Sequence, residues 1–233
     1  MVRTYYDAGV TAAPQEHATA PPAPTSLADQ AYTAIQDRLI MLDIPPMAPI
    51  DDAALSSSLG VGRTPVREAL KRLEVDRLVV AYPRRGTFAT GVDITDLAYI
   101  SEIRVQLEPL AARRAAEVAG SGMRTELAEL AEATGGLDAG AVDRTELMRW
   151  DLRVHRAIYR AAGNPHLQDT LVRYHNLATR IHCLFLDRLA HVDRHVGEHA
   201  GLLRAIAAGE ADTAETISRD HVTGFERAIR AVI

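Results

Sequence analysis

Hydrophobic residues recur at helical spacing through most of this chain. After Ser26, the apolar positions Tyr32, Ile35, Leu39 and Leu42 follow one another at intervals of three and four residues, which predicts an amphipathic helix. The prolines of the segment DIPPMAPI then end that helix, because proline cannot continue one. The chain therefore opens its ordered part with a helix rather than a strand.

Two shorter helices are predicted next. The segment DDAALSSSLG has acids in its first turn and Gly60 at its end, which suits a short helix. A third helix is predicted to start at Thr64, as its cap, with Pro65 at the first helical position and VREALKRLEVDRL behind it. Two short helices joined by Gly-Val-Gly have the form of a helix-turn-helix.

A β-hairpin is predicted directly after these helices. Residues 78–82 and 87–90 favour strands and flank the turn Pro-Arg-Arg-Gly, so the hairpin has the form of a basic wing. Residues 63–85 contain seven basic and three acidic side chains, a local charge of +4, although the whole chain carries −5. Because phosphate binding depends on the local field, this segment remains a candidate for DNA binding.

The rest of the chain is predicted to be helical. Glycine-rich links separate six candidate helices: residues 94–119, 125–133, 143–162, 165–188, 191–208 and 210–232. Short links favour antiparallel packing, so the fold class is mainly α, with an N-terminal winged helix-turn-helix, its small β-hairpin wing and a C-terminal all-helical antiparallel bundle. The predicted divisions are a flexible tail over 1–26, a DNA-binding domain over 27–92 and a sensing and dimerisation domain over 93–233.

Composition narrows the class of protein further. Hydrophobic residues make up 47% and charged residues 24%, as in ordinary globular proteins, and few residues are typical strand formers. Cys183 is the only cysteine, which excludes an intramolecular disulfide and a zinc site made of several thiolates. No apolar run approaches the ~20 residues of a membrane span, and the start of the chain does not resemble a signal peptide. We therefore expect a cytoplasmic protein without a membrane partner.

The third predicted helix and the hairpin contain the candidate DNA-reading residues. Arg63, Thr64 and Arg67 lie near the start of that helix, where a helix-turn-helix meets base edges and arginine binds guanine in bidentate fashion. Arg85 and Gly86 at the wing tip are candidates for the minor groove, Gly86 because a missing side chain permits close approach. Periodicity alone is equally compatible with an amphipathic helix that has a solvated basic face. The order of the elements favours DNA binding.

The segment GVGRTPVREALKRLEVDRLVVAYPRRGTFAT resembles the signature of the GntR family of transcription regulators, over residues 27–92. The resemblance implies that Arg63, Thr64, Arg67 and Gly86 contact operator DNA. It also implies a homodimer, since a helix-turn-helix that reads a palindrome acts as a symmetric pair.

Three departures from the usual GntR pattern bear on DNA recognition. Gly62 replaces the usual serine of the turn, Asp43 and Ala48 replace glycines around the first loop, and Ala53 stands where some relatives have an arginine. We expect these to alter affinity or operator sequence, not the class of protein.

A candidate metal site lies in the C-terminal part. Asp151 and His155 are four residues apart and so project from one helix face, and His199 and His221 lie on two later predicted helices. Imidazoles and a carboxylate together suit a divalent transition metal such as Zn, Ni or Mn. On spacing alone, an Asp-x3-His pair is more often a surface or capping pair.

Residues 95–233 resemble the FCD effector domain of the FadR subfamily, through ISEIRVQLEPLAARRAA, DLRVHRAIYRAAGNPHL and EHAGLLRAIAAGEADTAETISRDHV. The resemblance implies that Asp151, His155, His199 and His221 are the metal ligands. It also implies that Arg104 pairs with the carboxylate of an organic-acid effector, although a surface arginine on a helix is the plainer interpretation. The expected protein is a regulator, by analogy a repressor, that a small carboxylate or sugar acid releases from DNA.

Other functions are compatible with the same ligands. A metal-dependent enzyme would need a general base beside the metal and a catalytic motif, and neither is found, so we expect no enzyme. A regulator that senses the metal itself, without an organic effector, is an alternative. A metal that only braces the helical bundle is another.

Overall fold

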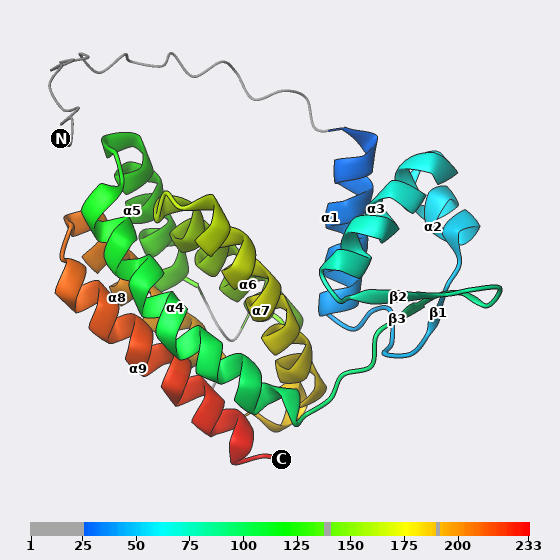
Figure 1. Cartoon of the computed structure of the whole chain (residues 1–233). Coiled ribbons are helices and arrows are strands. Elements are labelled where there is room, and N and C mark those ends of the chain that lie inside the picture. The colour runs from blue at the N-terminus through cyan, green and yellow to red at the C-terminus, as the bar shows by residue number, and fades with distance from the viewer. Residues whose placement is uncertain (1–25, 138–140, 190–191) are drawn as a thin grey trace, which may run out of the picture.

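The protein consists of a small N-terminal head and a larger helical bundle, joined by the segment that follows the hairpin (Figure 1). The computed structural model describes residues 26–137, 141–189 and 192–233, so the predicted tail lies outside the described residues except for Ser26. The fold is 74% helical, with a small three-stranded sheet, which confirms the predicted fold class. None of the helices in the described ranges combines the length and apolar character that crossing a bilayer requires.

The head contains three helices, and side-chain caps fix the starts of the first two. These helices are α1 (Leu27–Ile40), α2 (Asp52–Leu59) and α3 (Arg63–Val75). The Ser26 hydroxyl accepts from the Asp29 amide while the Asp29 carboxylate accepts from the Ser26 amide, a capping box. The Asp51 carboxylate accepts from the amides of Ala53 and Ala54 at the start of α2.

Helix α3 begins two residues earlier than predicted, at Arg63 instead of Pro65. Gly62 is its N-cap and makes no side-chain hydrogen bond, so the predicted cap at Thr64 is wrong. Pro65 still lies in the first turn, where the amide that proline lacks would have no partner within the helix. The glycine that replaces the usual serine therefore leaves this helix start without a side-chain cap.

The predicted hairpin is part of a three-stranded antiparallel sheet in the order β1-β3-β2. The strands are β1 (Pro49–Ile50), β2 (Val79–Tyr82) and β3 (Gly86–Ala89). The two-residue strand β1 escaped prediction because it is too short to show alternation. Tyr82 pairs with Gly86 across the hairpin, and Gly86 has a φ of 95°, a conformation that residues with side chains rarely adopt.

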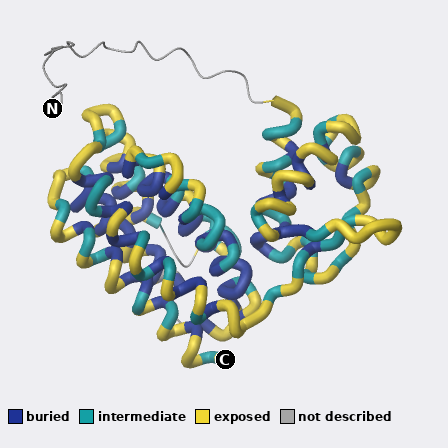
Figure 2. The backbone as a smooth tube through the Cα atoms, viewed as in Figure 1, coloured by how far each residue is buried: buried dark blue, intermediate teal, exposed yellow. Residues whose placement is uncertain are grey.

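The bundle contains six α-helices among the described residues. They are α4 (Asp96–Val118), α5 (Ser121–Gly135), α6 (Arg144–Ala161), α7 (Pro165–Leu184), α8 (Val192–Ala208) and α9 (Ala211–Arg230), with a short 3-10 helix at Leu186–Arg188. Helix α9 runs beside α4, and α8 beside α5 (Figure 1). Buried positions lie along the inward faces of these helices, whereas the hairpin tip is exposed (Figure 2). Alanines at positions 111, 112, 115 and 116 of α4 are almost fully buried, which permits close helix packing.

Arginines from the bundle connect it to the head. Helix α1 packs against α7, and the buried apolar residues of the head belong to the same cluster as Met148 of α6. Arg156 donates to the Gln36 side chain at 2.9 Å. Arg180 donates from its two terminal nitrogens to the hydroxyl and the carbonyl of Thr90, at 2.6 and 2.8 Å. The head is thus held at the residue that directly follows β3.

Candidate DNA-binding face and buried histidine site

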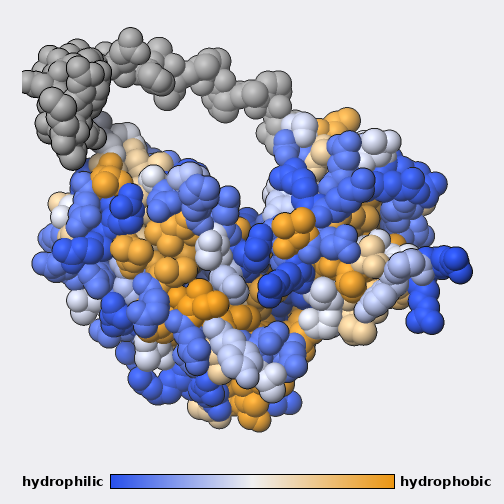
Figure 3. Space-filling view, viewed as in Figure 1, coloured by the Kyte–Doolittle hydropathy of each residue, from blue (hydrophilic) through white to orange (hydrophobic). Residues whose placement is uncertain are grey.

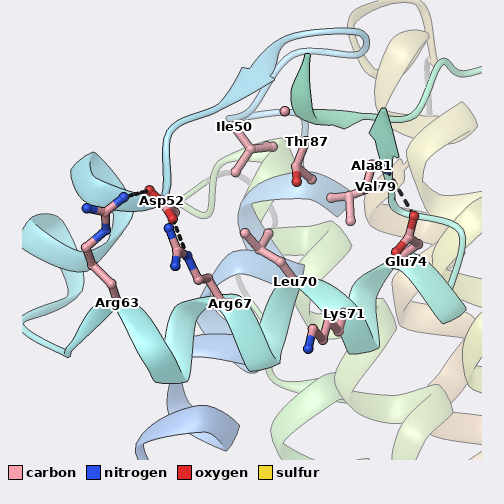
Figure 4. Close-up of a pocket in the computed structure, with 11 residues that line it drawn as sticks. Ile50, Asp52, Arg63, Arg67, Leu70, Lys71, Glu74, Val79, Ala81 and Thr87 are labelled. Atoms are coloured by element: carbon pink, nitrogen blue, oxygen red, sulfur yellow. Dashed lines mark hydrogen bonds and ion pairs between the residues drawn. The ribbon is translucent and has the colours of Figure 1, made fainter. Parts of the chain in front are cut away.

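A groove between α3 and the hairpin forms the candidate DNA-binding face (Figure 4). Its lining contains Ile50, Asp52, Arg63, Arg67, Leu70, Lys71, Glu74, Val79, Ala81, Gly86 and Thr87. The side chains of Arg63 and Arg67 are 57% and 61% exposed, so both are accessible to DNA. Glu74 accepts from the amide of Ala81 at 3.0 Å, which links the recognition helix to the wing.

Asp52 at the start of α2 holds both of these arginines. Its Oδ1 accepts from Nη2 of Arg63 and its Oδ2 from Nε of Arg67, each at 2.7 Å (Figure 4). The hydrogen bond from Arg67 and then that from Arg63 lower the pKa of the Asp52 carboxyl. The two guanidinium groups are therefore fixed side by side before DNA is present, and sequence reasoning missed this role of Asp52.

The remaining predicted DNA contacts are also exposed. Thr64 lies in the first turn of α3, and Arg85 and Gly86 lie at the tip of the hairpin. This tip projects from the molecule as a hydrophilic extension (Figure 3). The structure thus brings Arg63, Arg67 and Gly86 to one groove, with Thr64 and Arg85 as their exposed neighbours in the sequence.

The four predicted metal ligands meet inside the bundle. Asp151 and His155 come from α6, His199 from α8 and His221 from α9, and each is at most 5% exposed. Each offers one ligand atom, and these atoms all lie within 4.8 Å of one another. Residues up to 70 positions apart in the sequence thus form one compact cluster.

Distances within the cluster suit a coordinated ion. Nε2 of His155 and Nε2 of His199 are 3.0 Å apart, and Oδ1 of Asp151 lies 3.7 and 3.5 Å from them. Ligands at about 2.1 Å from a metal are themselves separated by roughly 3.0 to 3.4 Å in octahedral or tetrahedral geometry. Among the described residues, Oδ1 of Asp151 and both ring nitrogens of His221 lack a hydrogen-bond partner. Unpartnered buried polar atoms are costly, so these residues fit a divalent transition metal.

Protonation also favours metal binding. Burial lowers the pKa of His199 and of His221 well below the ordinary histidine value, so both imidazoles are neutral at pH 7. Burial by itself raises the pKa of Asp151, but nearby histidines, His155 foremost, hold it well below its usual range. Neutral imidazoles and an ionised carboxylate are the forms that bind metals.

Further buried histidines lie near the four predicted ligands. Nε2 of His175 is 3.1 Å from Oδ2 of Asp151, at an angle unsuited to a hydrogen bond, and Nε2 of His195 is 3.5 Å from Oδ1. The ring of His195 stacks on His221, and the edge of the His182 ring meets Phe225. Sequence reasoning assigned none of these histidines a ligand position. The seven-residue spacing of His175 and His182, which places both on one face of α7, was the available signal.

Arg104 and Glu108 form a buried ion pair beside the histidines. Nε of Arg104 donates to Oε1 of Glu108 at 2.5 Å, and Oε2 of Glu108 lies 3.1 Å from Nδ1 of His155. Burial raises the pKa of Glu108, but the positive charge of Arg104 and the contact with His155 hold it well below the usual range. Arg104 is thus placed near the predicted ligands, while its Nε is already engaged by Glu108, a residue that sequence reasoning missed.

Comparison with known proteins identifies both parts. Residues 27–89 match the model of bacterial regulatory proteins of the gntR family, and residues 99–224 match that of the FCD domain. The uncharacterised HTH-type transcriptional regulator YdhC of Bacillus subtilis is 29% identical over 204 residues, covering 87% of this chain and 81% of that protein. The galactonate operon transcriptional repressor of Escherichia coli is 24% identical over 201 residues, covering 78% and 86%.

Solved structures support the same fold. The structure of E. coli McbR/YncC aligns with a TM-score of 0.75 at 22% identity, covering 88% of this chain and 98% of that one. The family and its relatives are transcription regulators, which confirms the expectation that the protein is not an enzyme. With the recognition helix, the wing and the bundle in place, the chain belongs to the GntR family and is a DNA-binding transcription regulator with an FCD domain.

Proposed function

We propose that this regulator is a repressor whose bundle binds a small organic acid through a divalent metal and so changes its affinity for operator DNA. The observation that carries the proposal is the convergence of Asp151, His155, His199 and His221 at one buried point. We further propose a cytoplasmic homodimer of the FadR subfamily, divided into a DNA-binding domain over 27–92 and a sensing domain over 93–233.

Asp151, His155, His199 and His221 would hold the metal. Four protein ligands leave positions open on a six-coordinate ion, where a bound metal supplies a Lewis-acid contact for a carboxylate or hydroxyl oxygen. Only Nε of Arg104 is engaged by Glu108, so we propose that its terminal nitrogens pair with the acid. The name of the galactonate operon repressor, whose operon concerns a sugar acid, supports this ligand class.

The groove of the head would read the operator. We propose that Arg63, Thr64 and Arg67 enter the major groove and that Arg85 and Gly86 approach the minor groove. In a dimer, the two heads would contact half-sites about one helical turn apart.

Helix α7 offers a route between the two sites. His175 meets Asp151 of the histidine cluster, while Arg180 of the same helix holds Thr90 at the base of the head. An acid that prefers one position of α7 would therefore favour one arrangement of the heads, with a coupling of ~1–3 kcal/mol typical of such systems.

Thermal unfolding tests the binding site. We would chelate the purified protein, add Zn, Ni or Mn, and then add a panel of small carboxylates and sugar acids. A ligand that binds only the folded state adds ~2.7 kcal/mol at 100 times its dissociation constant. We expect one acid to raise the melting temperature only with metal present, and the increase to disappear in His199→Ala. The exposed His166→Ala is the matched control and should respond like the wild type.

Two outcomes would contradict the proposal. If metal alone stabilises the protein and no acid adds to it, a metal-sensing regulator or a structural metal replaces the acid sensor. If neither metal nor acid changes the melting temperature, the buried cluster is not a binding site.

A further inference from the structure

Glu108 of α4 is not one of the four proposed metal ligands, but one of its oxygens lies close to the ring of His155, which is. It is 2% exposed, and its two oxygens have different partners. Oε1 accepts from Nε of Arg104 at 2.5 Å, and Oε2 lies 3.1 Å from Nδ1 of His155. The ion pair with Arg104 anchors the carboxylate, and its other oxygen lies within reach of Nδ1 of His155.

We infer that Glu108 is a positioning residue that keeps the proton of His155 on Nδ1 and so presents Nε2 as the metal-binding atom. This inference rests on the metal site proposed above. An ionised carboxylate only accepts hydrogen bonds, so a neutral imidazole whose Nδ1 faces it carries its proton there. The other nitrogen, Nε2, then turns its lone pair toward Nε2 of His199, at 3.0 Å, and toward Asp151.

In the other two proposed ligand histidines, Nδ1 lies near a backbone oxygen or near a more distant carboxylate. Nδ1 of His199 faces the carbonyl oxygen of Val196 at 3.1 Å, an acceptor that side-chain substitution does not remove. Nδ1 of His221 is 3.7 Å from Oε2 of Glu198, which is 46% exposed. Among the described residues, Glu108 is therefore the one buried carboxylate that lies against Nδ1 of these three histidines. Such outer partners orient ligand histidines and typically contribute 10- to 100-fold to metal affinity.

Two other roles for the same atoms must be distinguished. Glu108 lies close enough to His155 and His175 to be considered a metal ligand itself, but its Oε1 already faces the cationic Arg104. The hydroxyl of Tyr159 also lies 3.1 Å from Nδ1 of His155. If Tyr159 donated there, the proton would move to Nε2 and the metal-binding atom would be blocked.

The tautomer of His155 in the metal-free wild type tests the inference without any substitution. Long-range proton–nitrogen NMR of the full chain should show His155 protonated at Nδ1, and Tyr159→Phe should leave that tautomer unchanged. A proton found on Nε2 in the wild type would overturn the inference, and so would a change of tautomer in Tyr159→Phe.

Zinc affinity provides the second measurement. Titration of the full chain against a chromophoric chelator should show a dissociation constant 10 to 100 times weaker in Glu108→Gln than in the wild type. Glu102→Gln, an exposed acid on the same helix, is the control and should match the wild type. Unchanged zinc affinity in a folded Glu108→Gln, judged by circular dichroism, would contradict the positioning role, and complete loss of binding would make Glu108 a ligand. If the wild type itself binds no zinc, the proposed metal site fails, while the tautomer measurement still tests Glu108.

Discussion

At both candidate sites of this protein, a carboxylate contacts a different basic group with each of its two oxygens. Asp52 holds Arg63 and Arg67 in the groove, and Glu108 lies between Arg104 and His155 in the bundle. The exposed Asp52 pairs are weakened by solvent and ions, so their role is orientation rather than stability. The buried Glu108 is different, because removing its charge would leave Arg104 without its partner.

Arg67 provides the clearest residue-level prediction. Arg67→Ala should weaken binding to an operator-type duplex, selected from random sequences with the wild type, by about 1–3 kcal/mol, a factor of roughly 5 to 150, and should relax sequence preference. Fluorescence anisotropy at one fixed salt concentration measures this. Arg153→Ala, which removes an equal charge from an exposed position on α6, should change affinity little. Equal losses in both variants would mean that Arg67 acts only through charge.

Sequence reasoning named the four residues that the fold brings together in the bundle, but not the residues around them. The i, i+4 spacing of Asp151 and His155, together with a family resemblance, was sufficient to predict which residues would cluster. Glu108 and His175 were missed because no local pattern shows which face of α4 or α7 packs against α6. The role of Asp52 was missed for the same reason, since its partners lie on the next helix.

At the level of elements, α7 is the helix that touches both functional regions. Its His175 side chain meets Asp151, and Arg180 donates to Thr90 at the base of the head. Arg180 is 2% exposed and burial lowers its pKa to about 10. No carboxylate in the described part of the chain pairs with it, and its Nε has no hydrogen-bond partner there. A buried, unpaired cation is costly, so its retention points to a role in connecting the two parts.

The variant Arg180→Met tests whether Arg180 connects the head to the bundle or only stabilises the fold. Because methionine removes an unpaired buried cation, we expect the melting temperature to stay level or rise, while backbone amides of residues 90–95 exchange faster with deuterium. Arg153→Met, at an exposed position on α6, serves as the control. A large drop in melting temperature with unchanged exchange at residues 90–95 would show that Arg180 only stabilises the fold.

The helix starts allow a simpler prediction. Asp51→Ala removes the side chain that accepts from the amides of Ala53 and Ala54, and should lower the free energy of unfolding by ~1 kcal/mol in urea titrations.

Sequence patterns located every helix to within a few residues, since long amphipathic stretches are informative. The patterns missed β1, because a strand of two residues shows no alternation. They misplaced the start of α3, because its glycine cap has no side chain typical of a cap.

At the scale of the whole molecule, the buried histidines make stability depend on pH. Burial lowers the pKa of His175 to about 4 and that of His182 well below its ordinary value. In the unfolded chain both return to ~6.5. As pH falls from about 7 to 5, the unfolded state therefore takes up protons that the folded state does not, and stability decreases. Urea unfolding of the chelated protein measures this, and a free energy that is flat or rising over the same interval would contradict it.

We propose that a metal and an acid bound in the bundle together control DNA binding by the head. The most direct test is operator affinity, by anisotropy at fixed salt, for metal-loaded and chelated protein with and without the acid that stabilises it. We predict that the acid weakens operator binding by about 5- to 150-fold, and that chelation or His199→Ala abolishes the effect. Operator affinity that is the same in all of these states would contradict the account.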